Sequence, residues 1–290
     1  MPTWLKPAGI IFPLLVLLVG CTSAPAGTLP ATPPPAVALT NTLAATPTRL
    51  PSPTATPPQP PTPPPTPTPD PPAVCSPLEG YALSDLAGMI VNPYAPPPVG
   101  SDQPHQGIDL AQLDPATRIA LPGLPVRALL AGEVVMVTNN RFPYGNAVLV
   151  KVPFDAVTAT GLNPAALPTP MPTLAANPAL TCPQPENIPA WDPNHRALFV
   201  LYAHLQNTPM VQPGEQIRCG QELGTIGDSG NALNPHLHLE IRVGPADAAL
   251  SGMAHYDNSA TPMEMAAYCL WRVSGWFQPV NPEIFFAETK

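Results

Sequence analysis

Residues 236–243 read His-Leu-His-Leu-Glu-Ile-Arg-Val, and their alternation decides the fold class. Successive side chains of a β-strand point to opposite faces, so Leu237 and Leu239 share one face while His236 and His238 share the other. Leucines that face a core would hold both imidazole rings rigidly toward a site. A His-x-His pair on a strand is ambiguous by itself, because paired surface histidines fit the same pattern.

Further short β-type runs bounded by glycine or proline extend this pattern, at residues 88–91, 125–137, 146–152, 197–204 and 216–226. Many short strands with glycine turns and few helices predict a mainly β fold, an antiparallel sandwich or barrel. Two similar segments, 124–135 and 211–227, are each predicted to be a strand–turn–strand hairpin. Their glycines would occupy positions that need a positive φ.

Two inserts interrupt the β pattern. Residues 153–194 are rich in Pro, Ala and Asn and are predicted to be a long loop between two strands, which is uncommon unless the loop is functional or disordered. Residues 246–278 contain a helix start, with Thr261 as N-cap, Pro262 at the first helical position and Glu264 reaching back. We therefore expect one or two short helices, placed in the inserts.

A second histidine fragment, residues 105–109, reads His-Gln-Gly-Ile-Asp. His105 and Asp109 are ligand types that suit zinc, and Gly107 supplies the bend that would let both reach one ion. Taken alone, the fragment also fits a solvated loop.

A third fragment, residues 201–205, reads Leu-Tyr-Ala-His-Leu. It is an apolar strand end whose polar face carries Tyr202 and His204. Taken alone, His204 also fits a buried histidine whose ring nitrogens are hydrogen-bonded within the core.

The three fragments, with Gly-Asp-Ser-Gly-Asn at 227–231 and Pro-His-Leu-His-Leu-Glu at 235–240, together resemble the lysostaphin/LytM-type zinc endopeptidases of bacterial peptidoglycan. The resemblance covers roughly residues 102–243, and Pro-Val-Asn-Pro at 279–282 also looks like that family's end. It implies a lipoyl-like hybrid barrel or sandwich of antiparallel strands, one Zn²⁺ ion, and hydrolysis of peptide bonds in stem peptides or cross-bridges.

The resemblance also implies site roles: His105, Asp109 and His238 as zinc ligands, and His204 and His236 as the catalytic histidines. Three protein ligands leave a fourth position open for water, as catalytic zinc requires. A histidine that is not bound to metal can take and deliver protons near neutral pH.

Four other residues complete the set that the sequence singles out. Tyr202 is a candidate for supporting the oxyanion, and a core tyrosine is the alternative. Glu240 shares the face of the third ligand and is a candidate for orienting it, with a surface position at the strand end as the alternative. His195 and His255 match no family position and are expected at the surface.

The N-terminus indicates export. Lys6 and the apolar run 8–19 form a signal peptide that is too short to span a bilayer stably. The run ends in Leu-Val-Gly-Cys, which resembles the lipobox of bacterial lipoproteins, so residues 1–21 are predicted to be a lipoprotein signal with Cys21 acylated. We expect an extracytoplasmic protein that is lipid-anchored to the bacterial cell envelope through Cys21.

Composition sets the remaining boundaries. Nineteen of the 49 prolines crowd into residues 22–74. This Pro/Thr/Ala-rich stretch has too little apolar surface to offset the entropy of folding, which predicts a disordered stalk. The folded domain should therefore run over 75–290. A net charge of −8 without a basic stripe argues against a nucleic-acid partner.

The four cysteines of the folded part predict two disulfides. Cys75, Cys182, Cys219 and Cys269 are even in number in an exported domain, and three pairings are open. None forms a C-x-x-C pair, which argues against a cysteine zinc site.

Residues 92–100 depart from the family, which usually has a Ser/Gly/Arg-containing turn there, so the substrate contacts of this segment stay open. The two inserts lie where loops would form the walls of the substrate groove. An alternative function is therefore a non-catalytic LytM-like lipoprotein that binds cell wall or activates another hydrolase. A lipoyl-like carrier is disfavoured, because neither Lys151 nor Lys290 lies at a hairpin turn.

Overall fold

The computed structural model describes residues 74–169, 180–184, 192 and 194–286. All of them belong to one compact unit, Thr66–Lys290. The signal peptide, the lipidation site Cys21 and the stalk lie outside the described residues. Among the residues described, no helix combines the length and apolarity needed to cross a membrane.

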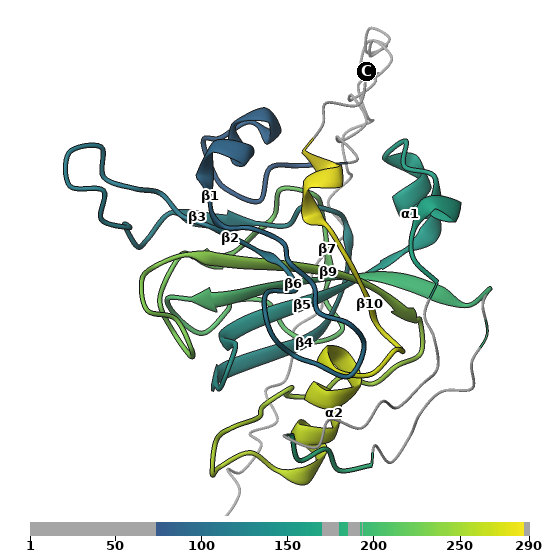
Figure 1. The fold of residues 1–290 in the computed structure, drawn as a ribbon. Helices are drawn as coiled ribbons and strands as arrows, with labels where there is room; N and C mark the ends of the chain where they lie inside the picture. Colours follow the sequence, from purple (N-terminus) through teal and green to yellow (C-terminus); the bar gives the residue numbers. More distant parts are fainter. Residues whose placement is uncertain (1–73, 170–179, 185–191, 193, 287–290) are drawn as a thin grey trace, which may run out of the picture. The chain divides into compact units, whose positions relative to one another are not determined.

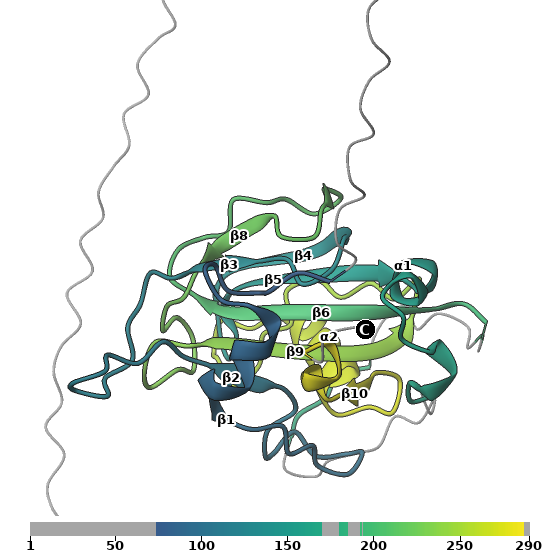
Figure 2. The ribbon, with the colours of Figure 1, turned by 90° about the horizontal axis from the view of Figure 1, so that it is seen from above.

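An antiparallel sheet forms the centre of the fold, in the strand order β1-β2-β9-β6-β5-β4-β7, with β10 also pairing β9 (Figure 1). Figure 2 shows the neighbours β4, β5, β6 and β9 side by side. The strands are β1 (Ile90–Asn92), β2 (Ile108–Leu110), β4 (Gly132–Arg141), β5 (Gly145–Pro153), β6 (Arg196–Leu205), β7 (Gln216–Ile217), β9 (Leu237–Pro245) and β10 (Gln278–Val280). A second sheet pairs β3 (Pro125–Arg127) with β8 (Glu222–Thr225).

Helices are few and short, so the predicted mainly β fold is confirmed. The α-helices are α1 (Phe154–Ala159) and α2 (Pro262–Arg272), and both lie in the inserts. Three 3₁₀ turns complete the described elements: η1 (Leu83–Met89), η2 (Pro164–Ala166) and η3 (Pro282–Phe285).

The two predicted hairpins do not form, and that prediction is wrong. Instead, the two similar segments pair with each other, since β3 pairs β8 and β4 pairs β7. The link between β3 and β4 includes Ala128, Leu129 and Leu130, which are at most 1% exposed. Because this link is apolar, it runs through the core from one sheet to the other and makes no surface turn.

The glycines of these segments serve two different purposes. Gly214 and Gly220 have positive φ, as predicted. Gly132, Gly224 and Gly227 do not, and a Cβ on Gly132 would lie 2.4 Å from the carbonyl oxygen of Lys151. Gly132 is therefore needed for the close approach of β4 to β5, which corrects the prediction for this position.

The large sheet is buried on both faces. On one face, Leu237 and Leu239 pack in a cluster that also includes residues of β3 and β8. On the other face, Phe199 of β6 contacts Trp271 of α2 and Phe277, with ring centroids 6.4 and 5.3 Å apart. Full burial of such side chains contributes about 1.5–3 kcal/mol each, so α2 is an integral part of the domain.

The helix start in the second insert is confirmed. The Thr261 side chain accepts a hydrogen bond from the Glu264 amide, and the Glu264 carboxylate accepts one from the Thr261 amide. Arg141 of β4 donates two hydrogen bonds to the Glu264 carboxylate, at 2.8 and 2.6 Å. The first turn of α2 is thereby fixed to the sheet.

The prediction of a continuous loop in the first insert is wrong for its opening residues. Phe154, Ala156 and Val157 pack against the core, with Val157 fully buried, and this apolar spacing favours the short helix α1 over a loop.

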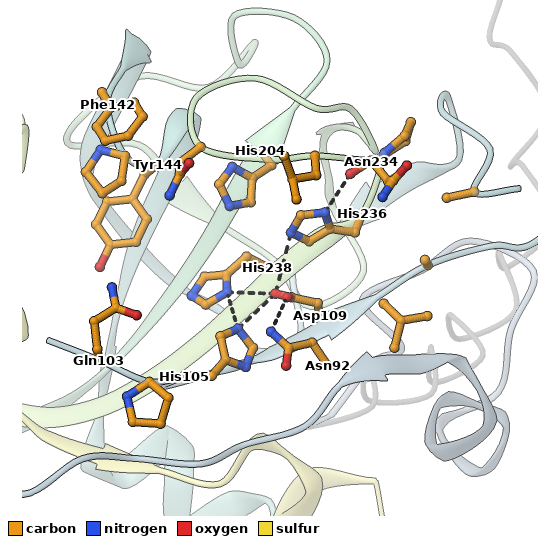
Figure 3. A pocket seen from close by; sticks show the side chains of 18 of the residues that line it. Asn92, Gln103, His105, Asp109, Phe142, Tyr144, His204, Asn234, His236 and His238 are labelled. Atoms are coloured by element: carbon orange, nitrogen blue, oxygen red, sulfur yellow. Dashed lines mark hydrogen bonds and ion pairs between the residues drawn. The ribbon is translucent and has the colours of Figure 1, made fainter.

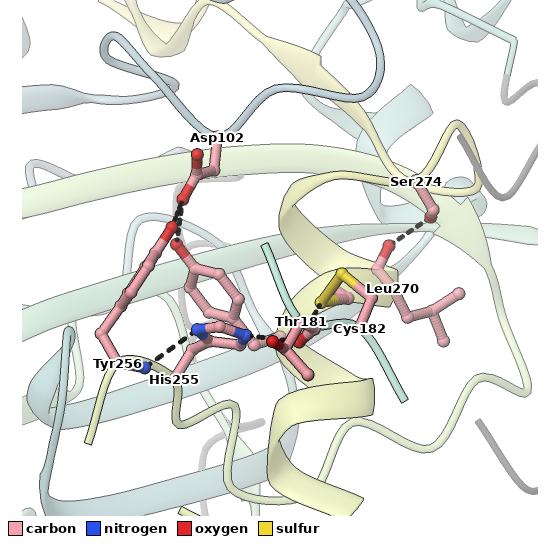
Figure 4. The surroundings of a disulfide bond; sticks show 9 residues. Asp102, Thr181, Cys182, His255, Tyr256, Leu270 and Ser274 are labelled. Carbon is pink, nitrogen blue, oxygen red and sulfur yellow. Dashed lines mark hydrogen bonds between the residues drawn. A yellow bond between two sulfur atoms is a disulfide. The ribbon is translucent and has the colours of Figure 1, made fainter. Parts of the chain in front are cut away.

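Two disulfides are present, as predicted, and the structure gives their pairing: Cys75–Cys219 and Cys182–Cys269. The second one joins the two inserts (Figure 4). Beside it, Nε2 of His255 lies 2.8 Å from the Thr181 carbonyl oxygen.

The surface prediction for His255 is wrong. Its side chain is buried because the two inserts fold onto each other around it. His195 is exposed, as expected, and its Nε2 atom lies 3.0 Å from the Asp247 carboxylate.

Candidate metal centre

Pairing of β2 with β9 brings two of the three expected ligands together. Asp109 and His238 are direct cross-strand partners in this antiparallel pair. His105 precedes β2, and Gly107 lets the intervening chain pass close to β9, because a Cβ at that position would lie 2.5 Å from the Leu239 carbonyl oxygen. The bend expected from Gly107 thus depends on its lack of a side chain.

The ligand atoms of these three residues converge on one point (Figure 3). Nε2 of His105 lies 3.0 Å from Oδ1 of Asp109 and 3.1 Å from Nδ1 of His238. The His238 nitrogen lies 2.9 Å from the same carboxylate oxygen. Ligand atoms of a tetrahedral zinc ion, each about 2.0–2.2 Å from the metal, lie roughly 3.3 Å apart, so the triangle has the dimensions of a zinc site.

Hydrogen bonds on the outer side of each ring determine what the inner nitrogens offer. Nδ1 of His105 lies 3.0 Å from the Pro93 carbonyl oxygen, and Nε2 of His238 lies 3.1 Å from Oε2 of Glu240. Both oxygens can only accept, so each outer nitrogen carries the proton and each inner nitrogen of a neutral ring carries a lone pair. Two lone pairs and a carboxylate oxygen then face one another, an arrangement that calls for a cation.

Asp109 is held in its ionised form. Burial raises its pKa, but without a metal an inner imidazole nitrogen of His105 or His238 that carries a proton donates it to Oδ1, and these hydrogen bonds outweigh burial and hold the pKa far below its usual range. The other carboxylate oxygen accepts a hydrogen bond of 2.9 Å from the side-chain amide of Asn92. Asn92 therefore leaves Oδ1 free to face the two imidazoles.

His204 adopts a left-handed backbone conformation, with φ 63°, at the end of β6. A non-glycine residue in this region is uncommon and is found preferentially at functional sites. The amide of His204 donates to the Tyr144 carbonyl at 3.0 Å, and its Nδ1 lies 2.7 Å from the Ser229 carbonyl oxygen. The ring therefore lies in the pocket, although the strand alternation would have paired it with the core residue Tyr202.

The two expected catalytic histidines are neighbours. The ring centroids of His204 and His236 are 4.8 Å apart, and Nδ1 of His236 lies 2.7 Å from the Asn234 carbonyl oxygen. As in His204, the carbonyl holds the proton on Nδ1, so the lone pair is on Nε2, which in His236 lies 3.6 Å from Oδ1 of Asp109. Burial, together with the nearby His238 and His236, lowers the pKa of His204 to about 3, so its imidazole is neutral at pH 7.

Tyr202 lies away from the pocket. Its side chain is fully buried in the core, and its hydroxyl oxygen accepts a hydrogen bond of 2.8 Å from the Leu129 amide. The structure thus places Tyr202 as a core tyrosine, which was the alternative to an oxyanion role.

Glu240 is not at the surface. It is fully buried, and besides His238 it binds the guanidinium groups of Arg242 and Arg272. These cations hold its pKa well below the usual range despite the opposing effect of burial. The surface alternative is wrong because β9 is covered on this face by the second insert.

A pocket of about 870 Å³ surrounds the cluster. Its lining includes residues that sequence patterns did not reveal, because they reach the site only through tertiary packing: Asn92, Tyr144, Tyr256, Tyr268 and Arg272. Tyr144 is almost fully enclosed, at 4% exposure, and its hydroxyl lies 3.4 Å from the Glu240 carboxylate. Tyr256, Tyr268 and Arg272 show that the second insert forms part of the pocket wall, as predicted.

Residues 193–250 match the family model of Peptidase family M23. The chain carries an M23 peptidase segment. This M23 segment includes three of the five clustered side chains: His204, His236 and His238. For residues 193–250, the family resemblance expected from the sequence is thereby confirmed.

Two curated relatives match the chain. It is 26% identical over 155 residues to "Uncharacterized lipoprotein YgeR" of Escherichia coli (strain K12), covering 53% of this chain and 39% of the relative. It is 45% identical over 42 residues to "Peptidoglycan DD-endopeptidase ShyC" of Vibrio cholerae, covering 14% and 10%. The chain thus spans well under two thirds of either relative.

Solved structures of M23 proteins overlap the chain weakly. The catalytic domain of lysostaphin from Staphylococcus simulans gives 17% identity, a TM-score of 0.31, and coverage of 56% of this chain and 86% of that one. A catalytic-domain mutant of the M23 protein EnpA from Enterococcus faecalis gives 20% identity, a TM-score of 0.32, and coverage of 56% and 85%. TM-scores this low support no conclusion about the M23 segment of this chain.

Proposed function

We propose that this chain is a zinc metallo-endopeptidase that hydrolyses peptide bonds in the stem peptides or cross-bridges of peptidoglycan. The observation that carries the proposal is the convergence of His105, Asp109 and His238 on one point, with two further histidines beside it in an open pocket. The M23 match supports the peptidase class. The printed activity of ShyC supports the substrate.

The three converging atoms would hold one Zn²⁺ ion, which would supply Lewis-acid activation of a water molecule and of the scissile carbonyl. Glu240 fixes the His238 ring, and Asn92 fixes the Asp109 carboxylate. Both contacts leave the inner atoms free for the ion, and such supporting contacts tune metal affinity.

His204 and His236 would handle the protons. Each has its Nδ1 proton held by a backbone carbonyl, so each presents Nε2 to the substrate as an acceptor. A neutral Nε2 takes a proton from the attacking water, and a protonated Nε2 donates to the departing amine or to the developing oxyanion. Because both rings lie on the same side of the pocket, they can divide these tasks between them.

The cellular setting is also a proposal. We place residues 1–21 as a signal ending at lipidated Cys21, residues 22–74 as a stalk, and residues 75–290 as the peptidase domain with its two inserts. The printed lipoprotein name of YgeR supports the anchor. Two disulfides in one domain are typical of an oxidising compartment outside the cytoplasm.

Digestion of purified peptidoglycan tests the activity. The protein, expressed from residue 22 onward, should release muropeptides with new peptide ends, detected by mass spectrometry. A chelator should abolish the release, and His236→Ala should lower its rate strongly. Absence of new peptide ends at every zinc loading contradicts the enzyme. A zinc-free protein that instead captures a cell-wall amidase would support the alternative, a non-catalytic LytM-like lipoprotein.

A further inference from the structure

The carboxylate of Glu240 connects the metal cluster to the second insert. It is fully buried on β9, two residues after His238. Its Oε2 atom accepts from Nε2 of His238 at 3.1 Å and from Nη1 of Arg272 at 2.8 Å. Arg242 binds the other oxygen, Oε1. Arg272 and the candidate ligand His238 therefore bind the same carboxylate oxygen of Glu240.

Arg272 also holds the other ligand segment. Its Nε and Nη2 atoms donate to the carbonyl oxygen of Asp102, at 3.3 and 3.2 Å. Asp102 opens the segment that carries His105 and Asp109. One guanidinium group thus spans the two chain segments that provide all three ligands, and its side chain is only 9% exposed.

This contact comes from a part of the chain beyond the M23 match, which ends at residue 250. Arg272 is the last residue of α2. The helix is held independently by the Cys182–Cys269 disulfide, by the Arg141–Glu264 ion pair and by the buried Trp271. Loss of the Arg272 side chain would therefore leave α2 in place and change mainly the environment of Glu240.

We propose that Arg272 is a positioning residue for the metal centre, acting through Glu240 on His238 and through Asp102 on the segment that carries His105. The proposal rests on the proposed function, because it needs a metal at the cluster. Arg272 holds Oε2 of Glu240 where it keeps the proton on Nε2 of His238, so the lone pair of Nδ1 stays directed at the ion. Without Arg272, Oε2 turns away, and the imidazole can present an N–H to the metal position.

Zinc affinity tests the proposal. In the protein expressed from residue 22 onward, competition with a chromogenic chelator should show Arg272→Met binding Zn²⁺ about 10–100-fold more weakly than the wild type. Arg272→Lys keeps a donor for Glu240 and should recover part of the loss. The matched control is Arg141→Met, which removes the arginine of the other α2 ion pair; it should leave zinc affinity unchanged.

A double-mutant cycle separates positioning from general stability. In a Glu240→Gln background, Arg272→Met should weaken zinc binding less than it does in the wild type, because the route through Glu240 is already cut and only the contact with Asp102 remains to be lost. Additive losses, an equal loss in Arg141→Met, or unchanged affinity in Arg272→Met would each overturn the proposal. A wild-type protein that binds no zinc would instead overturn the proposed function, and that result is distinguishable from the other three.

Discussion

Nδ1 of His204 lies 2.7 Å from the carbonyl oxygen of Ser229, although 25 residues separate the two in sequence. The hydroxyl of the same serine donates to the Leu205 carbonyl at 2.7 Å and accepts from the Asn146 amide at 2.9 Å. Ser229 thus fixes the turn after β8 against the end of β6. The orientation of the His204 ring depends on this loop, which lies outside the strand that carries the ring.

Replacement of the pocket histidines should separate catalysis from metal binding. His204→Ala or His236→Ala should lower kcat/KM on peptidoglycan by about 10²–10⁴, the usual contribution of a general acid or base, while zinc content stays unchanged. His195→Ala is the matched control, because His195 is exposed and should be neutral in both assays. Loss of zinc in His204→Ala would show that His204 is a ligand and contradict its assignment.

Gly230 should be required for the loop that orients His204. Its φ is 73°, and a Cβ would lie 2.4 Å from both the Gly145 amide and the Pro143 carbonyl. Gly230→Ala should therefore lower the free energy of unfolding by about 1–3 kcal/mol through overpacking, and should also lower kcat.

Gly214→Ala is the control for Gly230→Ala, because Gly214 also has positive φ but has open space around it. It should cost only the backbone strain, about 1–2 kcal/mol, with kcat unchanged. Urea denaturation and peptidoglycan digestion measure the two effects. Full activity in Gly230→Ala would contradict the role of the loop.

The Cys182–Cys269 disulfide should stabilise the insert wall. It closes a loop of 87 residues, so the double variant Cys182→Ser/Cys269→Ser should lose about 2–4 kcal/mol of unfolding free energy. Chemical denaturation under oxidising conditions checks the value. A non-reducing tryptic map should show Cys182 linked to Cys269, and a map that links Cys182 to Cys75 or Cys219 would contradict the pairing.

Zinc binding should compete with a proton at His238. Burial lowers the pKa of His238, but the carboxylates of Asp109 and Glu240 outweigh burial and raise it above its ordinary value. The metal-free cluster therefore holds a proton more firmly than a free imidazole does, and Zn²⁺ must displace that proton, so affinity should fall as the pH falls. Calorimetry in buffers of different ionisation enthalpy measures the release, and a binding enthalpy independent of the buffer would contradict it.

The cluster of His105, Asp109 and His238 could be predicted from the sequence because each part of it is encoded by residues close together in the chain. The alternation of 236–243 places both histidines on one face, and the spacing of His105, Gly107 and Asp109 fits a bend. Both patterns depend on residues within one strand or turn, and so does the capping pattern at Thr261. Their geometry therefore follows from neighbours in the chain.

Features that depend on contacts between residues far apart in the chain could not be predicted from the sequence. The pairing of β3 with β8 follows from burial of the apolar link between β3 and β4, which a local glycine pattern cannot distinguish from a turn. His204 departs from strand alternation because its φ is positive, which separates it from Tyr202, although alternation would place both side chains on one face. The burial of Glu240 and His255 depends on how the second insert folds back, and no short pattern encodes this.

Metal analysis of single ligand variants tests the central claim most directly. The protein, purified with zinc and dialysed, should contain one Zn²⁺ per chain by inductively coupled plasma mass spectrometry. His105→Ala, Asp109→Ala and His238→Ala should each lose it while remaining folded by circular dichroism. Stoichiometric zinc retained in all three folded variants would contradict the account, because the ion would then be bound elsewhere.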